Sequence, residues 1–308
     1  MSSILQTSQW ADFKASQGFE IIKLDGLFVH KRALPLSNNF LYIPEASASD
    51  INGNQIELLK DLAKKQNSIF LRLEMIDRFG DNAKKILESM GFVPAFEQIQ
   101  PKWRQIVDLK PTRGSILAAM KQKGRYNMKL AEKKGVTIKQ LSLDGKSPDQ
   151  ERFLRNMYAL YNNTVKREKI GGRSFDYFEK MVEAFSSTNY LSVYIAYYNN
   201  KPLAGALISF YEGVASYLYG GSSSENREVM APYLMHWQIM MDAKERGCES
   251  YDLIGRAKPG DETSSWAGLT RFKEQFGGEA VEILGSFDFI AKPLFYKMFK
   301  TAEKIRRK

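Results

Sequence analysis

The chain has 308 residues, of which 44% are hydrophobic, and this is enough for one large domain or two of ordinary size. A single cysteine excludes an intrachain disulfide and any multi-cysteine metal site, and with two histidines we expect neither a metal centre nor a serine–histidine triad. The net charge of +10 indicates an anionic partner, namely nucleic acid, a phosphate-bearing substrate or an anionic membrane surface, with a merely basic protein as the alternative.

The first half of the sequence predicts one α/β unit. Asp25-Gly26 lies between two alternating stretches and is a strong hairpin signal. Pro44 is expected to end the strand that precedes it, because proline cannot donate a ladder hydrogen bond. The pattern predicts a helix, three strands, a helix, a strand and a helix, followed by strands as far as residue 109: 8–17, 19–24, 27–34, 40–44, 55–66, 68–76 and 82–90.

Two basic segments follow the first half and end the chain. The seam lies at residues 110–114, where proline and glycine interrupt the pattern. Residues 113–134 carry seven basic residues against Glu132, and we expect two short helices there, broken near Gly124. The helical tail 292–308 carries seven basic residues against Glu303. Each segment is a candidate anion-binding surface, and a solvated helix is the alternative.

The last third has the most informative order of elements. After helices at 149–168 and 175–185, the pattern predicts three strands, a helix, a strand, a short helix and a strand: 191–198, 203–210, 214–219, 229–246, 250–254, 268–276 and 280–289. This order is typical of an N-acyltransferase fold.

The short helix carries the run RFKEQFGG, residues 271–278. Lys273 lies between Phe272 and Phe276, so an apolar wall stands beside a cation. A lysine in this place can meet a carbonyl oxygen as that oxygen acquires charge. The alternative is a surface lysine whose stem lies along the aromatic rings.

Residues 275–280, QFGGEA, fit the letters of a coenzyme A loop. We discount coenzyme A, because a strand is expected after Gly278 and a pyrophosphate needs a helix N-terminus. Asp108 is a candidate general base if it faces a cleft, and a structural aspartate at a strand end is the alternative.

The two halves of the sequence share a short pattern of elements. Residues 87–93 and 273–279 both end a helix at glycine and lead into a strand. This pattern indicates two copies of a similar fold.

Several long motifs in order carry a resemblance to a known family: GFVPAFEQIQPKWRQIVDL (91–109), KGRYNMKLAEKKGV (123–136), GGRSFDYF (171–178), ASYLYGGSSSENREVMAPYLMHWQIM (215–240), YDLIG (251–255) and GLTRFKEQFGG (268–278). Over essentially its whole length the chain resembles the Fem family of peptidoglycan bridge-forming aminoacyltransferases. The resemblance implies an α/β (α+β) protein of two N-acyltransferase (GNAT)-like domains packed side by side, without a long coiled-coil arm. We expect residues 1–110 with 285–308 in the first domain and 111–284 in the second.

The resemblance also implies site residues. The lysine of the family's FK-x-x-F-G segment, linked to the acyl end of the tRNA substrate, falls on Lys273. The contacts to the nucleotide diphosphate of the precursor fall on Lys31 or Arg32, on Arg173 and Tyr177, and on Tyr217 or Tyr219. The chain departs from the family at residues 42–47, which read YIPEAS where many members read Tyr-x-Pro-Arg-Gly-Pro. The first-domain side of the precursor site therefore lacks an arginine and a glycine.

The implied activity moves an amino acid from aminoacyl-tRNA to the stem-peptide amine of a UDP-linked or lipid-linked peptidoglycan precursor. The ester is already activated, so neither a metal nor a cofactor is needed, and Lys273 stabilises the oxyanion of the tetrahedral intermediate. The alternatives are an acyl-CoA-dependent N-acyltransferase and a non-catalytic RNA-binding module. We expect a cytoplasmic monomer, since the chain has neither a signal-peptide layout nor a run of ~18 apolar residues, and we consider peripheral contact with a membrane surface.

Overall fold

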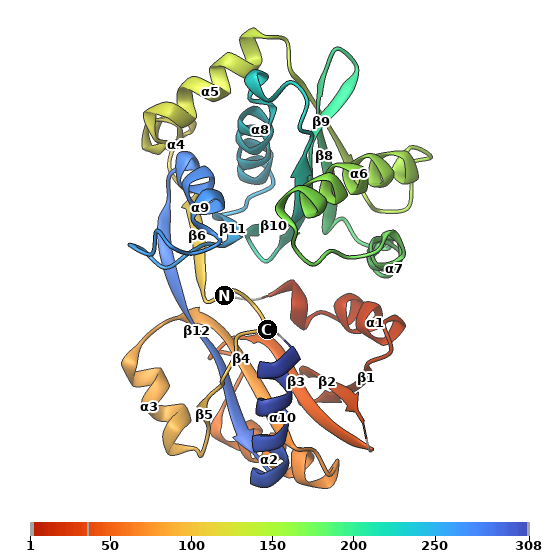
Figure 1. Ribbon diagram of the computed structural model, residues 1–308, viewed down its shortest axis with the longest axis vertical. Helices are drawn as coiled ribbons and strands as arrows, with labels where there is room; N and C mark the ends of the chain where they lie inside the picture. The colour runs from red at the N-terminus through yellow and green to blue at the C-terminus, as the bar shows by residue number, and fades with distance from the viewer. Residues whose placement is uncertain (1–2, 36, 307–308) are drawn as a thin grey trace. The chain divides into compact units, whose positions relative to one another are not determined.

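The computed structural model describes residues 3–35 and 37–306 of the chain (Figure 1). The chain folds into two compact units, unit 1 with Met1–Lys102 and Glu282–Lys308, and unit 2 with Trp103–Val281. Each unit combines a mixed sheet with helices, so the expected α/β class is confirmed. Among the described helices, none is long and apolar enough to cross a bilayer.

Unit 1 contains a five-stranded sheet with a short extra strand. Its elements are η1 (Ile4–Gln6), α1 (Ser8–Ser16), β1 (Glu20–Leu24), β2 (Leu27–Leu34), β3 (Asn38–Ala46), α2 (Gly53–Lys65), β4 (Phe70–Arg78), α3 (Asp81–Ser89), β5 (Val93–Pro94), β12 (Glu279–Ile290, in this unit from Glu282 on) and α10 (Pro293–Arg306). The strand order is β1-β2-β3-β4-β12, and β5 pairs with β12. The pair β3–β4 is parallel and its strands are joined through α2, whereas the other neighbours are antiparallel.

Alternate residues of β3 build the two cores of unit 1. Leu41 and Ile43 pack in the core that contains residues of α2 and α3. Phe40 and Tyr42 point to the opposite face, where Tyr296 of α10 completes the core. The sheet is therefore covered on both faces, with α10 on the side away from α2.

Pro44 does not end its strand, and that expectation is wrong. β3 continues to Ala46, and its pairing with β4 shifts register between Ile43 and Ala46. A proline is tolerated at such an irregularity because no ladder donor is required there. The Pro44 carbonyl accepts a hydrogen bond from Gln6 Nε2 at 2.8 Å instead.

Unit 2 contains a six-stranded sheet of the same design. Its elements are β6 (Trp103–Asp108), α4 (Arg113–Ala119), α5 (Gln122–Lys133), β7 (Thr137–Ser142), α6 (Gln150–Glu168), α7 (Phe175–Phe185), β8 (Leu191–Tyr198), β9 (Lys201–Tyr211), β10 (Val214–Ser222), η2 (Arg227–Val229), α8 (Ala231–Glu245), β11 (Ser250–Gly255), α9 (Ala267–Lys273) and η3 (Glu274–Phe276). The strand order is β6-β11-β10-β9-β8-β7. Again one pair, β10–β11, is parallel and is joined through a helix, α8.

Helices cover both faces of this sheet (Figure 1). α6 packs across β8, β9 and β10 on one face, and α8, with α5 beside it, packs on the other. Gly221 of β10 allows α6 to approach, because a Cβ there would lie 2.3 Å from the Leu160 carbonyl oxygen. The longest described helix is α6, with 19 residues, so the expected absence of a long coiled-coil arm is confirmed for the described chain.

The two short basic helices are present as expected, and the break between them lies at residues 120–121, shortly before Gly124 rather than at the glycine itself. α4 ends at Ala119 and α5 begins at Gln122, which leaves Gly124 inside α5. A Cβ on Gly124 would lie 2.3 Å from the Gln275 carbonyl oxygen. The glycine is therefore required for close packing of α5 against η3 rather than for a turn.

Candidate active site

A β-bulge in β10 separates the two candidate tyrosines of that strand. The register with β9 shifts between Tyr217 and Tyr219, so Leu218 is an extra residue. In a regular strand, residues two apart point to the same face. Here the ring of Tyr217 contacts His236 of α8, whereas the ring of Tyr219 contacts Phe178 of α7 on the other face. The two tyrosines therefore belong to two different clusters.

Lys273 is the centre of the first cluster. It is the last residue of α9, and only 4% of its surface is exposed, so the alternative of a surface lysine is wrong. Its Nζ donates a hydrogen bond to the Gly255 carbonyl oxygen at 2.6 Å and lies 6.0 Å from the ring centroid of Tyr217. An ammonium has three donors, and this bond uses one of them. The position is that of a fixed, desolvated hydrogen-bond donor.

Aromatic rings enclose the lysine cluster. The His236 ring lies 4.8 Å from Tyr217 and 4.9 Å from Phe276, measured between centroids. Its Nδ1 shares a hydrogen bond of 2.8 Å with the Tyr251 hydroxyl. Burial, and to a lesser extent the nearby ammonium of Lys273, lower the pKa of His236 to about 3, so this imidazole is neutral at physiological pH.

Two ion pairs surround Lys273. Arg104 Nη1 lies 2.8 Å from Asp252 Oδ2, and Arg256 Nη2 lies 2.8 Å from Glu274 Oε1. The pKa of Lys273 is lowered to about 8, mainly by burial; Asp252 opposes the shift, and Arg104 and Arg256 contribute to it. Three cations share the cluster with two carboxylates, and this excess of positive charge favours an anionic group.

Sequence reasoning missed these partners. The small number of histidines argues against a metal centre but assigns no role to His236, and the YDLIG motif assigns no role to Asp252. One signal in the sequence could have indicated them: in YDLIGR, two charged residues, Asp252 and Arg256, lie within and directly after a short apolar strand.

The second cluster brings together Arg173, Tyr177 and Tyr219. The hydroxyls of Tyr177 and Tyr219 lie 3.0 Å apart, and the Arg173 guanidinium lies 5.0 Å from the Tyr177 ring centroid. Ser174 starts α7 by accepting a hydrogen bond from the Tyr177 backbone N–H, and the Arg173 N–H donates to the Tyr161 hydroxyl at 3.0 Å. Burial raises the pKa of Tyr177 and of Tyr219, so both phenols stay neutral and can donate hydrogen bonds. Arg173 itself is exposed, which suits it to an incoming anion.

Lys31 and Arg32 are neighbours on β2 of unit 1. Lys31 Nζ lies 2.9 Å from Glu20 Oε2 and donates to Gln66 Oε1 at 2.9 Å. Arg32 is exposed, with its guanidinium 6.0 Å from the ring centroid of Phe40. Because consecutive strand residues point to opposite faces, Lys31 and Arg32 cannot serve the same side of the sheet.

Two weaker candidates from the sequence, Asp108 as a general base and residues 275–280 as a coenzyme A loop, have structural roles instead. Asp108 is exposed, and its Oδ1 accepts a hydrogen bond from the Lys110 N–H at 3.0 Å, as expected for an aspartate at a strand end. The strand expected after Gly278 is confirmed, since β12 begins at Glu279. A Cβ on Gly278 would lie 2.1 Å from the Ile106 carbonyl oxygen, so this glycine is required for packing against β6. The segment that matches a coenzyme A loop, residues 275–280, is therefore followed by a strand and not by a helix that could bind a phosphate.

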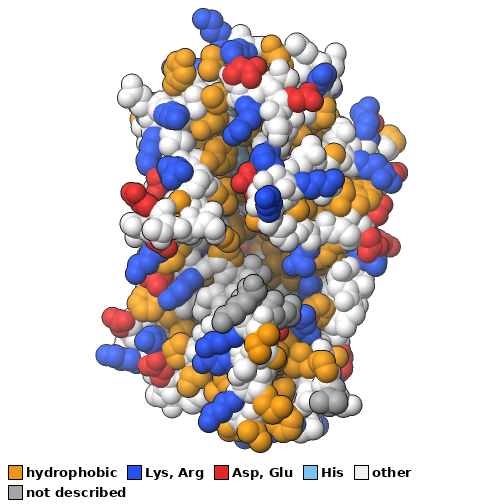
Figure 2. Space-filling model, viewed as in Figure 1, with side chains coloured by type: hydrophobic (Ala, Val, Ile, Leu, Met, Phe, Trp, Pro, Cys, Tyr) orange, Lys and Arg blue, Asp and Glu red, His pale blue; other side chains and the backbone are white. Residues whose placement is uncertain are grey.

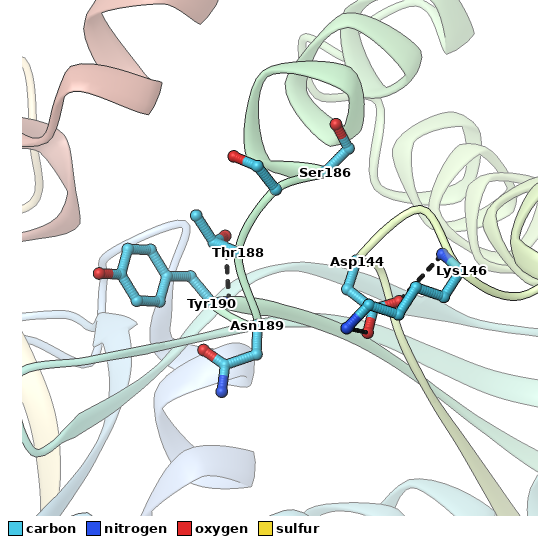
Figure 3. Close-up of a pocket in the computed structure, with 7 residues that line it drawn as sticks. Asp144, Lys146, Ser186, Thr188, Asn189 and Tyr190 are labelled. Carbon is cyan, nitrogen blue, oxygen red and sulfur yellow. Dashed lines mark hydrogen bonds and ion pairs between the residues drawn. The ribbon is translucent and has the colours of Figure 1, made fainter.

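A hollow of ≈560 Å³ lies elsewhere in unit 2, lined by Asp144, Lys146 and residues 186–190 (Figure 3). Two pairs of its polar groups contact each other, since Lys146 Nζ lies 3.5 Å from Asp144 Oδ2 and the Tyr190 N–H donates to the Thr188 hydroxyl. It contains no residue of either cluster. Within residues 3–35 and 37–306, no group of three His, Cys, Asp or Glu residues could hold a metal ion.

A sequence model described as the FemAB family matches residues 87–201 and 189–304. The lipid II:glycine glycyltransferase of Staphylococcus epidermidis is 22% identical over 391 positions, covering 99% of this chain and 92% of the relative. The protein of the same name from Staphylococcus aureus is 21% identical and covers 96% and 90%. Because 391 positions exceed the 308 residues of this chain, the S. epidermidis protein has segments that this chain lacks.

Solved structures share the fold. A crystal structure of FemX superposes with a TM-score of 0.83 at 20% identity, covering 96% of this chain and 94% of FemX. The structure of L-PGS from Bacillus licheniformis gives a TM-score of 0.59 at 15% identity, covering 94% and 90%. The expected fold is confirmed over nearly the whole chain.

Proposed function

Because the chain belongs to the FemAB family, as its motifs predicted, we propose that it is an aminoacyltransferase of peptidoglycan bridge formation. It transfers an amino acid from aminoacyl-tRNA to the stem-peptide amine of a peptidoglycan precursor. The relatives named lipid II:glycine glycyltransferase support both the reaction class and the kind of acceptor. The observation that carries the proposal is the buried ammonium of Lys273, enclosed by aromatic rings and held by the Gly255 carbonyl.

Lys273 acts on the transition state. The acceptor amine attacks the ester carbonyl, its oxygen becomes an oxyanion, and the C–O bond to the tRNA ribose then breaks. The amine loses a proton and the leaving ribose oxygen gains one, so the transfer needs no net acid or base. The Lys273 donors stabilise the oxyanion, and removal of one such donor costs roughly 10²–10³ in rate.

The second cluster suits the acceptor. Arg173 offers an exposed guanidinium, and Tyr177 and Tyr219 offer neutral hydroxyls. This combination fits the diphosphate of a UDP-linked or lipid-linked precursor, because charge-assisted hydrogen bonds to phosphate are strong. Lys31 or Arg32 is the contact proposed from unit 1.

The basic helices α4 and α5 suit the tRNA. The segment 113–134, which contains both helices, carries seven cationic side chains, and Tyr126 of α5 is 63% exposed and free to stack on a base. Lys121 Nζ lies 2.7 Å from Glu274 Oε2, and Gly124 packs against Gln275. These contacts fix α5 beside η3, the element that follows Lys273, so the acyl end of a tRNA reaches the ammonium if its acceptor stem binds to this segment.

The test incubates the purified chain with glycyl-, alanyl- or seryl-tRNA and with either precursor, and measures the precursor mass. We expect a gain of one amino-acid residue, with glycyl-tRNA tried first because of the relatives' names. Lys273→Met is the matched control and should bind tRNA while transferring roughly 10²–10³-fold more slowly. Absence of transfer from every donor tried would refute the proposal, and tRNA binding without transfer in both proteins would favour the RNA-binding module. Calorimetry with coenzyme A should show no binding, whereas binding would favour the acyl-CoA alternative.

A further inference from the structure

The C-terminal helix α10 is fixed to unit 1 by its inner face. The Tyr296 hydroxyl donates a hydrogen bond to Asp288 Oδ2 at 2.7 Å, and its side chain is buried. The ring of Phe299 packs against Phe40, Phe70 and Phe96, with centroids 5.3 to 6.0 Å apart. The orientation of the helix about its own axis is therefore determined, and so is the face that it turns outward.

The outer face of α10 carries an apolar stripe. Leu294, Met298 and Ile305 are 69%, 60% and 70% exposed, and Ala302 between them is exposed too. Their spacing of four, four and three residues places them on one side of a helix. Single exposed apolar residues are ordinary. Four of them along one side of three helical turns form an apolar patch, and such a patch indicates an interaction surface.

Cations border this stripe. At 100° per residue, Lys297 and Lys304 lie along one edge of the row formed by Leu294, Met298 and Ile305. From Lys292 to the end of the chain, seven basic residues stand against one acid. Hydrophobic and cationic side chains lie together over the surface that α10 occupies in Figure 1 (Figure 2).

We propose that the outer face of α10 docks the protein on an anionic phospholipid bilayer. The helix lies in the plane of the interface, its apolar stripe enters the boundary between headgroups and acyl chains, and its lysines meet the anionic headgroups. A second copy of the chain fits less well, because it would bring two rows of lysines together. RNA fits less well, because its bases stack on aromatic rings rather than on aliphatic side chains. The docking surface stands on α10 alone and does not depend on which acceptor or donor the active site uses.

The test is flotation of the purified full chain with phosphatidylcholine vesicles that either contain or lack phosphatidylglycerol. We expect binding to the anionic vesicles, with much weaker binding to the neutral ones. The variant Leu294→Gln/Met298→Gln/Ile305→Gln should lose binding. The variant Lys297→Gln/Lys304→Gln should weaken binding by roughly fivefold per lysine.

The control replaces two apolar residues that are about half exposed on other helices of unit 1, Leu58→Gln and Ile86→Gln. It should bind vesicles as the wild type does, and all variants should keep the wild-type thermal midpoint because the substitutions are exposed. Transfer to the soluble UDP-linked precursor needs no bilayer, so it should stay unchanged in the α10 variants. Equal vesicle binding by the triple variant and the wild type would overturn the proposal. The proposal would also be overturned if sedimentation showed a dimer of the wild type that the triple variant does not form, or if the triple variant no longer bound tRNA.

Discussion

Replacement of Lys273 by methionine tests whether the ammonium is truly desolvated. Methionine keeps an unbranched apolar stem and removes the charge. Burial lowers the pKa of the folded lysine from 10.5 to about 8, whereas the unfolded chain keeps the ordinary value. Between these two values the unfolded state binds more protons than the folded state, so the stability of the wild type rises with pH in that window.

The size of the effect follows from the shift. Between about pH 7 and about pH 10, this linkage adds about 2–3 kcal/mol to the free energy of unfolding of the wild type and nothing to that of Lys273→Met. At pH 7 the variant is relieved of a buried charge worth up to about 3 kcal/mol. It also leaves the Gly255 carbonyl without its donor, at a cost of ~1–3 kcal/mol, so the two proteins should have similar stability there.

The assay is urea unfolding followed by tryptophan fluorescence at both pH values. Three of the four tryptophans, Trp103, Trp237 and Trp266, belong to unit 2 and report on the unit that contains Lys273. Ionisation of other groups cancels in the difference between the two proteins. A difference that does not change with pH would refute the desolvated ammonium. A variant several kcal/mol less stable at pH 7 would show that the lysine is structural rather than catalytic.

The remaining predictions concern the rate, the packing and the two binding surfaces. Transfer at saturating substrate should decline above about pH 8 as Lys273 loses its proton, and a rate that still rises well beyond this pH would contradict the role of the ammonium. Gly124→Ala should lower the free energy of unfolding by about 1–3 kcal/mol because its Cβ meets the Gln275 carbonyl, while Gly114→Ala in α4, with nothing nearer than 3.9 Å, should be tolerated in the same urea titration. Tyr219→Phe should raise KM for the precursor several-fold with little change in kcat, since it removes one hydroxyl and keeps the ring; an equal fall in kcat would place Tyr219 in the chemistry instead. The logarithm of tRNA affinity should fall with the logarithm of salt concentration with a slope of several units, and Lys129→Gln should reduce that slope by about one; a flat response would remove α4 and α5 as the RNA surface.

Local chemistry decided which elements could be predicted from the sequence. The hairpin at Asp25-Gly26 is as expected, because both residues have positive φ, 46° and 87°, as a two-residue turn requires. The helix at 175–185 matches α7 residue for residue, since its Ser174 cap and its apolar periodicity are both local signals. β7, which pairs only with β8 at the end of the sheet, was not predicted, because its exposed polar residues give no alternating pattern.

Tertiary contacts explain the errors. Gly124 resembles a helix breaker in the sequence, and only the Gln275 carbonyl, about 150 residues away along the chain, shows why glycine is needed inside α5. The environment of Lys273 includes the Gly255 carbonyl and the Tyr217 ring, which come from two other elements, β11 and β10. Periodicity around Lys273 favoured a surface residue, and it was the resemblance of the whole chain to a family that singled this lysine out.

The bulge at Leu218 has a consequence for comparing this chain with its relatives. If β10 were regular here, with Leu218 paired as an ordinary strand residue, Tyr217 and Tyr219 would be two positions apart and would point to the same side of the sheet. One cluster would then contain both tyrosines of β10, and the other would contain neither. A gap misplaced by one position in an alignment would likewise assign a tyrosine of β10 to the wrong cluster. Whether a relative keeps a tyrosine beside its lysine or beside its arginine can therefore be judged only after the bulge itself has been aligned.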